Sequence, residues 1–323
     1  MKFFAVFVFS VVFCFFVWLG LVLRQAGHPT KMSQWIFDAY IKKEQIAKQI
    51  HGKKIVLVGG SNVLFGVDSK LLSKAFGLSV LNDGVNAGIE LPCILYEAKK
   101  VIRKGDIVIM SLEYPMYSYE GKPGVQMIDY VLSREPSCLR QLTWKEVFYI
   151  VWHVDFKRIL AGYFDLSQGS VTKGVYGAQH IDVYGDQTET ALAYRSKALY
   201  KEVLAYTTKP EKYGASFDGH ALGWKYLAEF VQWCRKRDVQ VVFMPSTLMR
   251  HASYFKNPKE HWFYTHIADE VRKRGWVFVG KPYDYMYPQE MYFNTNFHLI
   301  DKARKIRTLQ MVKDLQAYGF MQK

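Results

Sequence analysis

Two residues whose types suit acyl-transfer chemistry stand at opposite ends of the chain. Ser61 follows the apolar run 55–58 and the pair Gly59-Gly60, and His298 lies near the C-terminus. Because glycine tolerates positive φ and close backbone approach, this turn can project the Ser61 hydroxyl from the end of a strand. Backbone N–H groups and a hydroxyl then converge, which suits a nucleophile with an oxyanion hole and also a phosphate-binding loop.

His298 belongs to the segment 292–299, which reads YFNTNFHL and lies between the last expected strand and the last expected helix. In a parallel sheet this loop lies at the same carboxyl edge as Ser61. In a serine-histidine pair the imidazole takes the hydroxyl proton during attack and returns it to the leaving group, while a third group fixes the ring tautomer. The sequence therefore predicts a nucleophile and a general base at one sheet edge.

The elements that position these groups alternate between strand and helix. This alternation predicts an α/β fold, a three-layer α/β/α sandwich with a parallel sheet of flavodoxin-like type, over residues 53–323. Asp68 and the residues after it form the expected cap and first turn of the helix that follows the Ser61 turn. The expected strands are 55–58, 79–81, 106–112, 239–244 and 276–279, and the expected helices are 30–50, 89–103, 222–236, 261–274 and 302–318.

Residues 113–216 interrupt this alternation. The region is rich in aromatic residues and glycine and lacks a convincing run of core strands. We interpret it as an insertion over the carboxyl edge of the sheet, where open α/β sheets bind ligands. A structural elaboration without a binding role explains each single aromatic equally well.

The N-terminus carries a long apolar segment. Residues 3–23 contain no charge, and 21 residues at 1.5 Å each are enough to cross a hydrocarbon core of roughly 30 Å. We expect an uncleaved single-pass transmembrane helix over 1–24 and a stalk helix within 25–52, with a cleaved signal peptide as the alternative. Basic residues mostly follow the span, which favours a cytoplasmic domain, but long domains translocate largely regardless of such charges. We therefore expect an extracytoplasmic domain, on the basis of its chemistry.

The net charge is +14 and the isoelectric point lies near 9.4. An anionic lipid surface, an anionic cell-surface polymer and nucleic acid all attract such a chain. The basic residues are scattered and no nucleic-acid-binding signature accompanies them, so we do not expect a nucleic-acid partner.

Four cysteines are present, of which Cys14 falls in the apolar segment. The remaining three, Cys93, Cys138 and Cys234, cannot all pair, and no C-x-x-C spacing occurs. We therefore expect neither a disulfide framework nor a metal site. No cofactor motif is present either, because G-x-G-x-x-G and G-K-[ST] are both missing.

Three stretches together resemble the SGNH hydrolase superfamily. They are Gly60-Ser61-Asn62, the glycine-bearing loop 82–88, and the late segment ending at His298. The resemblance covers residues 53–115 and 220–318. It is closest to the membrane-anchored cell-surface branch that includes the teichoic acid D-alanine transfer protein and polysaccharide O-acetyltransferases, in which an anchor also precedes the catalytic domain.

The resemblance implies a role for each matching residue. Ser61 would be the nucleophile and His298 the base, and the oxyanion donors would be the Ser61 N–H and an N–H from loop 84–88, for which we choose Gly88. Gly84 and Asn62 would help to shape this hole. Glu113 stands where the wider family has an asparagine, and its role there is open.

The acid expected shortly before the histidine is missing. The matching position is Asn294, or Thr295 if the spacing is one residue shorter, and neither is a carboxylate. An amide oxygen can orient the imidazole but supplies no negative charge. Three alternatives follow: a Ser-His dyad, a substitute carboxylate such as Asp301 or Glu290, or a catalytically degenerate protein.

These features give three hypotheses. The first is an extracytoplasmic O-acyltransferase or esterase that passes an acetyl or D-alanyl group through a Ser61 ester to an anionic surface polymer, with a membrane-bound acyltransferase as the implied partner. The second is a non-catalytic protein of the same fold that binds and presents such a polymer or docks the acyltransferase. The third, a phosphate or nucleotide binder, lacks a supporting motif.

Overall fold

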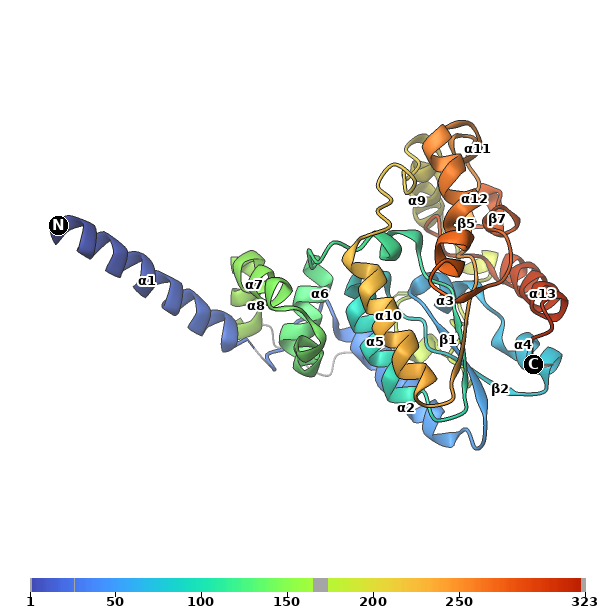
Figure 1. Cartoon of the computed structure of the whole chain (residues 1–323), viewed down its shortest axis with the longest axis horizontal. Helices are drawn as coiled ribbons and strands as arrows, with labels where there is room; N and C mark the ends of the chain where they lie inside the picture. Colours follow the sequence, from blue (N-terminus) through green and yellow to red (C-terminus); the bar gives the residue numbers. More distant parts are fainter. Residues whose placement is uncertain (1, 26, 165–173, 321–323) are drawn as a thin grey trace.

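The computed structural model describes residues 2–25, 27–164 and 174–320. Its centre is a parallel five-stranded sheet with the order β2-β1-β3-β4-β6 (Figure 1). The five expected strands are all present, so the α/β prediction with a parallel sheet is confirmed. Their bounds are β1 (Lys54–Val58), β2 (Ser79–Asn82), β3 (Ile107–Met110), β4 (Gln240–Phe243) and β6 (Val277–Phe278).

Both faces of the sheet are buried. In β1, Val56 and Val58 belong to one hydrophobic cluster and Ile55 and Leu57 to another, as the alternation of side chains along a strand requires. The helices α2, α5 and α10 pack on one face, and α4 and α13 on the other (Figure 1). The bounds are α2 (Gln34–Gln49), α4 (Ser69–Phe76), α5 (Glu90–Val101), α10 (Leu222–Arg235), α12 (Pro258–Arg272) and α13 (Asp301–Ala317).

Helix α2 differs from the expected stalk. The helix forms, but Ile36, Tyr40 and Ile46 are buried in the main hydrophobic cluster instead of standing apart from the domain. Lys43 is fully buried as well, and its Nζ donates hydrogen bonds to the carbonyl oxygens of Asn82, Gly84 and Gly185 at 2.5–2.8 Å. Helix α2 therefore packs on the sheet, and Lys43 satisfies three buried carbonyl oxygens that the mixture of apolar and basic residues did not reveal.

Two short strands were not expected. β5 (Leu248–Met249) and β7 (Met286–Tyr287) form a separate parallel pair, and the four-residue helix α11 (Ser253–Lys256) follows β5. A short helix, α3 (Ser61–Gly66), begins at Ser61 itself, where we expected only a turn. Asp68 caps α4 as expected, because its side chain accepts a hydrogen bond from Leu71 N at 2.9 Å.

The described part of the 113–216 insertion adds no strand to either sheet; residues 165–173 of this region lie outside the described residues. Its longer elements are helical: α6 (Val125–Asp129), a π-helical turn at Tyr130–Arg134, α7 (Trp144–His153), α8 (Phe156–Phe164) and α9 (Lys197–Thr208). The insertion therefore covers the domain with helices and loops.

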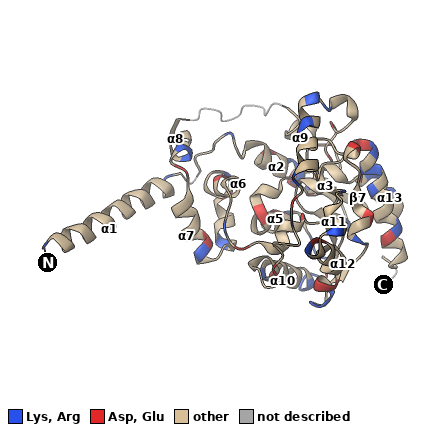
Figure 2. Cartoon of the chain, turned by 90° about the horizontal axis from the view of Figure 1, so that it is seen from above, with Lys and Arg blue, Asp and Glu red and all other residues tan. Residues whose placement is uncertain are grey.

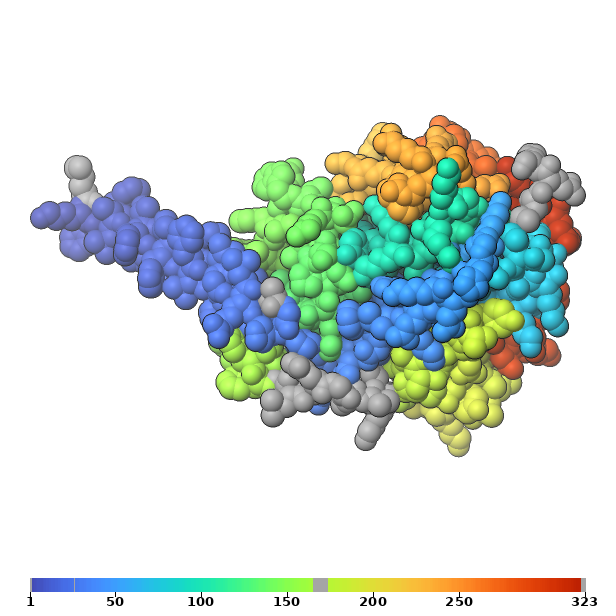
Figure 3. Space-filling view, turned by 90° about the horizontal axis from the view of Figure 1, so that it is seen from below, coloured from blue at the N-terminus to red at the C-terminus, as the bar shows by residue number. Residues whose placement is uncertain are grey.

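Helix α1 (Lys2–Leu23) projects from the domain as a single rod (Figure 1, Figure 3). Within the described residues it is the one helix long and apolar enough to cross a membrane. In Figure 2 helix α1 carries charge only at its first residue, Lys2, whereas positive and negative residues are mixed over the elements of the domain. The formal charge of +14 is therefore not concentrated on one helix in that view.

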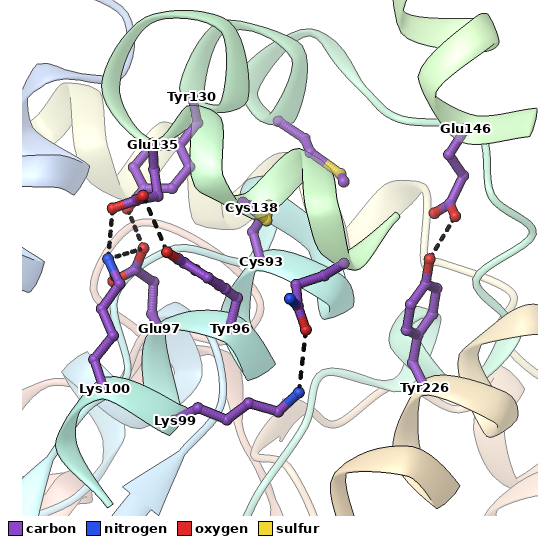
Figure 4. Close-up of a disulfide and its surroundings, with 12 residues drawn as sticks. Cys93, Tyr96, Glu97, Lys99, Lys100, Tyr130, Glu135, Cys138, Glu146 and Tyr226 are labelled. Carbon is purple, nitrogen blue, oxygen red and sulfur yellow. Dashed lines mark hydrogen bonds and ion pairs between the residues drawn. A yellow bond between two sulfur atoms is a disulfide. The ribbon is translucent and has the colours of Figure 1, made fainter. Parts of the chain in front are cut away.

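A disulfide joins Cys93 in α5 to Cys138, which lies in a 3₁₀ turn of the insertion, with their Cα atoms 6.0 Å apart (Figure 4). Our expectation that the cysteines form no disulfide is therefore wrong for this pair. Cys14 and Cys234 are free, so the three thiols outside α1 divide into one bridge and one buried thiol. The bridge fixes the insertion to the helix that begins at the candidate site.

Candidate active site

A cavity of about 720 Å³ lies at the carboxyl edge of the sheet. Because the strands are parallel, the segments that follow β1, β2 and β3 meet at this edge, and each contributes to the lining. The insertion supplies aromatic walls. The main lining residues are Ser61, Asn86, Ala87, Glu90, Glu113, Tyr119, Gln126, Tyr176, Tyr206, Tyr213, Asn296 and His298.

Ser61 is the first residue of α3 and is partly exposed to the cavity. The buried carboxylate of Glu113 accepts hydrogen bonds from the backbone on both sides of Ser61. One oxygen accepts from Gly60 N at 3.0 Å and the other from Asn62 N at 2.9 Å. A Cβ on Gly60 would lie 2.6 Å from this carboxylate and 2.8 Å from Ala87 N, so only glycine fits here. Glu113 thus positions Ser61 by accepting hydrogen bonds from the backbone N–H groups of the residues before and after it.

Asn62 does not line the cavity; its hydrogen bonds join the Ser61 turn to Ser111, which follows β3, and to Arg307 in α13. Arg307, which is fully buried in α13, donates to Asn62 O at 2.7 Å, to Asn62 Oδ1 at 3.0 Å and to Ser111 Oγ at 2.7 Å. The Asn62 amide in turn donates to Ser111 O at 2.9 Å. The structure therefore gives Asn62 a positioning role, and it brings Arg307 into the site as a second positioning residue.

His298 is buried against the cavity wall, with its ring stacked on Phe65 at 4.2 Å between centroids and 6° between planes. Nδ1 lies 2.7 Å from Asn294 Oδ1. An amide oxygen can only accept, so Nδ1 carries the proton and Nε2 is the basic nitrogen. Burial lowers the pKa of His298 to about 3, which keeps the imidazole neutral at ordinary pH.

The third position is therefore occupied by Asn294, the residue that the sequence spacing indicated. Its amide nitrogen donates to Tyr176 OH at 2.5 Å, so an insertion residue holds the amide in orientation. The two substitute carboxylates do not take this place: Asp301 accepts from Lys302 N at 2.7 Å, and Glu290 is exposed. Thr295 lines the cavity, and its hydroxyl accepts from Phe297 N.

Of the residues expected to form the oxyanion hole, the two glycines do not offer a free N–H group. Gly88 N is already bonded to Asn86 Oδ1 at 2.6 Å, and Gly84 N to Asn82 Oδ1 at 3.0 Å, so neither is free to donate. Gly84 is instead needed for packing, because a Cβ there would lie 2.6 Å from Gly60 O. The other expected donor, the N–H group of Ser61, has no hydrogen-bond partner among the described residues, and neither has the N–H group of Ala87 in the same loop as Gly88.

Glu90 is a cavity residue that the sequence did not single out. Its backbone adopts φ +59°, in the left-handed region that non-glycine residues rarely occupy. One carboxyl oxygen accepts from Gly124 N at 2.9 Å, and the other is buried without a hydrogen-bond partner in the described part of the chain. Burial raises the pKa of Glu90 to about 7. No pattern could have found it, since an acid at the start of a helix is ordinary.

The arrangement supplies a hydroxyl at a helix start, a neutral imidazole with an oriented tautomer, and, within the described part of the chain, two unpaired N–H groups of cavity residues. These are the parts of nucleophilic acyl transfer. Within the described ranges no cluster of three metal-binding side chains occurs. A scan against protein-family models finds no matching model, and searches of the curated proteins and of the solved structures find no similar chain.

Proposed function

We propose that this chain is a membrane-anchored O-acyltransferase or esterase that acts through an ester on Ser61. The observation that carries the proposal is the common cavity of Ser61 and His298, two residues from opposite ends of the sequence. The resemblance of the Gly60-Ser61-Asn62 and His298 segments to SGNH hydrolases supports the same reading. Under it, the sheet with helices on both faces is a three-layer sandwich of that superfamily.

In the proposed reaction, Ser61 Oγ attacks the carbonyl carbon of an acyl ester while His298 Nε2 takes the hydroxyl proton. The negative charge on the carbonyl oxygen is stabilised by the N–H groups of Ser61, as expected from the sequence, and of Ala87, which replaces Gly88 as our choice of loop donor. His298 returns the proton to the departing alcohol. An acceptor hydroxyl, or water, then reverses these steps and releases Ser61.

We place the domain on the extracytoplasmic side. The Cys93–Cys138 disulfide supports this placement, because disulfides persist in oxidising compartments. The basic residues after the apolar segment favoured the opposite, cytoplasmic placement. Two of them are engaged inside the folded domain, because Lys43 is buried and Lys42 Nζ donates to Ala178 O at 2.8 Å. The positive net charge suits an anionic surface polymer as acceptor. The acyl donor would come from a membrane-bound acyltransferase.

The alternative is a catalytically degenerate protein that binds and presents the polymer. Two observations favour it: Asn294 supplies no charge to an imidazolium, and burial lowers the pKa of His298 to about 3. Both make the histidine a weaker base than in a triad with a carboxylate.

The test is hydrolysis of an activated acetyl ester by the full chain in detergent micelles. We expect Ser61→Ala to abolish turnover, while Ser69→Ala, a change in a buried serine outside the cavity, should leave it in any variant that remains folded. Equal turnover by Ser61→Ala would remove the acyl-enzyme proposal. Unchanged acylation of surface polymer in cells that carry Ser61→Ala would favour the binding alternative.

A further inference from the structure

Helices α7 and α8 each expose a row of large apolar side chains, and both helices hydrogen-bond to α1 or to the residues just after it. Large apolar side chains recur at every fourth position along both helices, which places them on one face of each. Three of them are more than 60% exposed, which is unusual for side chains of this size. We call this surface the aromatic ledge, and its residues are Trp144, Phe148, Trp152, Phe156, Leu160 and Phe164.

The opposite faces of the same helices are fixed to the domain. Arg158 in α8 is buried; it forms an ion pair with Asp129 at 2.7 Å and donates to Gln25 Oε1 at 2.7 Å and to His28 O at 3.0 Å. Gln25 and His28 follow α1 directly. Arg158 therefore ties α8 to the segment through which α1 enters the domain.

The ledge is also level with the end of the apolar helix. Trp18 Nε1 in α1 donates to Val151 O in α7 at 2.7 Å. Trp18 precedes the end of α1 at Leu23 by roughly 7 Å at 1.5 Å per residue. Trp152 lines an apolar hollow along α1 together with residues as far back as Phe7. In Figure 3 the insertion segment adjoins the base of the α1 rod.

We propose that the aromatic ledge lies in the interface of the bilayer that α1 crosses, with its side chains at the boundary of headgroups and acyl chains. Tryptophan and phenylalanine are enriched at this depth. The exposed Lys145 and Lys157 stand beside the ledge and suit anionic headgroups. The ledge would then hold the domain, and the mouth of its cavity, at a fixed tilt above the membrane. This proposal rests on the membrane anchoring proposed above.

The test is quenching of tryptophan fluorescence by brominated lipid, with the full chain reconstituted into vesicles that contain no other protein. The chain has eight tryptophans, and the proposal puts Trp18, Trp144 and Trp152 in contact with lipid. We expect the change of both Trp144 and Trp152 to Phe to reduce the quenched amplitude by about two thirds, since two of three contacting rings are lost. Trp262→Phe is the matched control, because Trp262 is 42% exposed on α12, away from α1 (Figure 1).

Full quenching in the double variant would overturn the proposal, because the ledge would then be in water. Equal loss in the Trp262→Phe control would overturn it as well. If even the wild-type chain shows no quenching, α1 itself is not inserted and the anchoring fails together with the ledge. None of these results depends on Ser61, so a failed acyl-transfer proposal would be recognised separately. Thermal unfolding followed by circular dichroism checks that each variant is folded.

Discussion

Replacing Asn294 by aspartate tests how the site is built. The amide oxygen of Asn294 lies 2.7 Å from His298 Nδ1, and Tyr176 OH contacts the amide nitrogen at 2.5 Å. In Asn294→Asp the tyrosine hydroxyl can turn and donate to the new carboxylate, so both carboxyl oxygens have partners. The substitution therefore adds one negative charge beside the imidazole with little change of shape.

The size of the effect follows from this geometry. Two unit charges about 4 Å apart interact by about 4 kcal/mol at an effective dielectric constant near 20. Such an energy corresponds to roughly three pKa units. The pKa of His298, which burial lowers to about 3, should rise to around 6. If the imidazolium forms in the transition state, turnover should increase, by at most about 10³-fold.

The assay is the pH dependence of kcat/KM for an activated acetyl ester, measured for the wild type and for Asn294→Asp. We expect a faster variant whose acid limb is shifted upward by the change in the His298 pKa. Asn296→Asp is the matched control, because Asn296 also lines the cavity but contacts Tyr213 OH instead of the imidazole. A folded Asn294→Asp variant that is no faster than the wild type, or an equal gain in the control, would refute the reasoning.

Three further predictions concern stability, measured by unfolding of the full chain in micelles. In Glu113→Gln an NH₂ group replaces one of the two acceptor oxygens and meets a backbone N–H beside Ser61, so the free energy of unfolding should fall by roughly 1–3 kcal/mol. Unchanged stability would argue that the Glu113 carboxylate does not hold the Ser61 turn. Replacing Cys93 and Cys138 together by alanine opens a bridge with a sequence separation of 45 and should cost roughly 2–4 kcal/mol; a variant as stable as the wild type under non-reducing conditions would contradict a formed bridge. Because burial lowers the pKa of His298 to about 3, the unfolded chain binds a proton below about pH 6.5 that the folded chain does not. Stability should therefore fall by up to about 1.4 kcal/mol per pH unit between pH 6.5 and 3, and His298→Gln should remove this dependence; parallel pH profiles of the two proteins would contradict the lowered pKa.

The sheet could be predicted from the sequence because buried parallel strands form short apolar runs between glycine-rich turns. The run 55–58 and its four counterparts all lie in the sheet, and the boundaries differ by one or two residues. β5 and β7 have two residues each and, unlike the equally short β6 within the run 276–279, lie in no longer apolar run, so no pattern predicted them.

The site could be predicted only in part. The position of Ser61 and His298 at one sheet edge could be predicted because both follow strands of a parallel sheet. Asn294 could be predicted from its spacing to the histidine. Ala87 and Tyr176 could not be found, because their roles depend on how the loop after β2 and the insertion fold over the edge. These contacts join segments that are distant in the sequence, and no motif or spacing in either segment indicates that they meet.

The disulfide was missed for a related reason. Three thiols outside the apolar segment allow three different pairs, and spacing does not choose among them. The pair forms because Cys93 in α5 faces the insertion, whereas Cys234 is buried in α10. Lys43 likewise looked like a surface charge, and only the three carbonyl oxygens around it explain its burial.

The central claim is that Ser61 is a nucleophile activated by His298. Its most direct measurement is peptide mapping by mass spectrometry after treatment of the full chain with a serine-directed fluorophosphonate. We predict a single adduct on the peptide that contains Ser61, no adduct in Ser61→Ala, and strongly slowed labelling in His298→Gln. Labelling that persists in Ser61→Ala, or a Ser61 adduct that forms at the same rate without His298, would contradict the account.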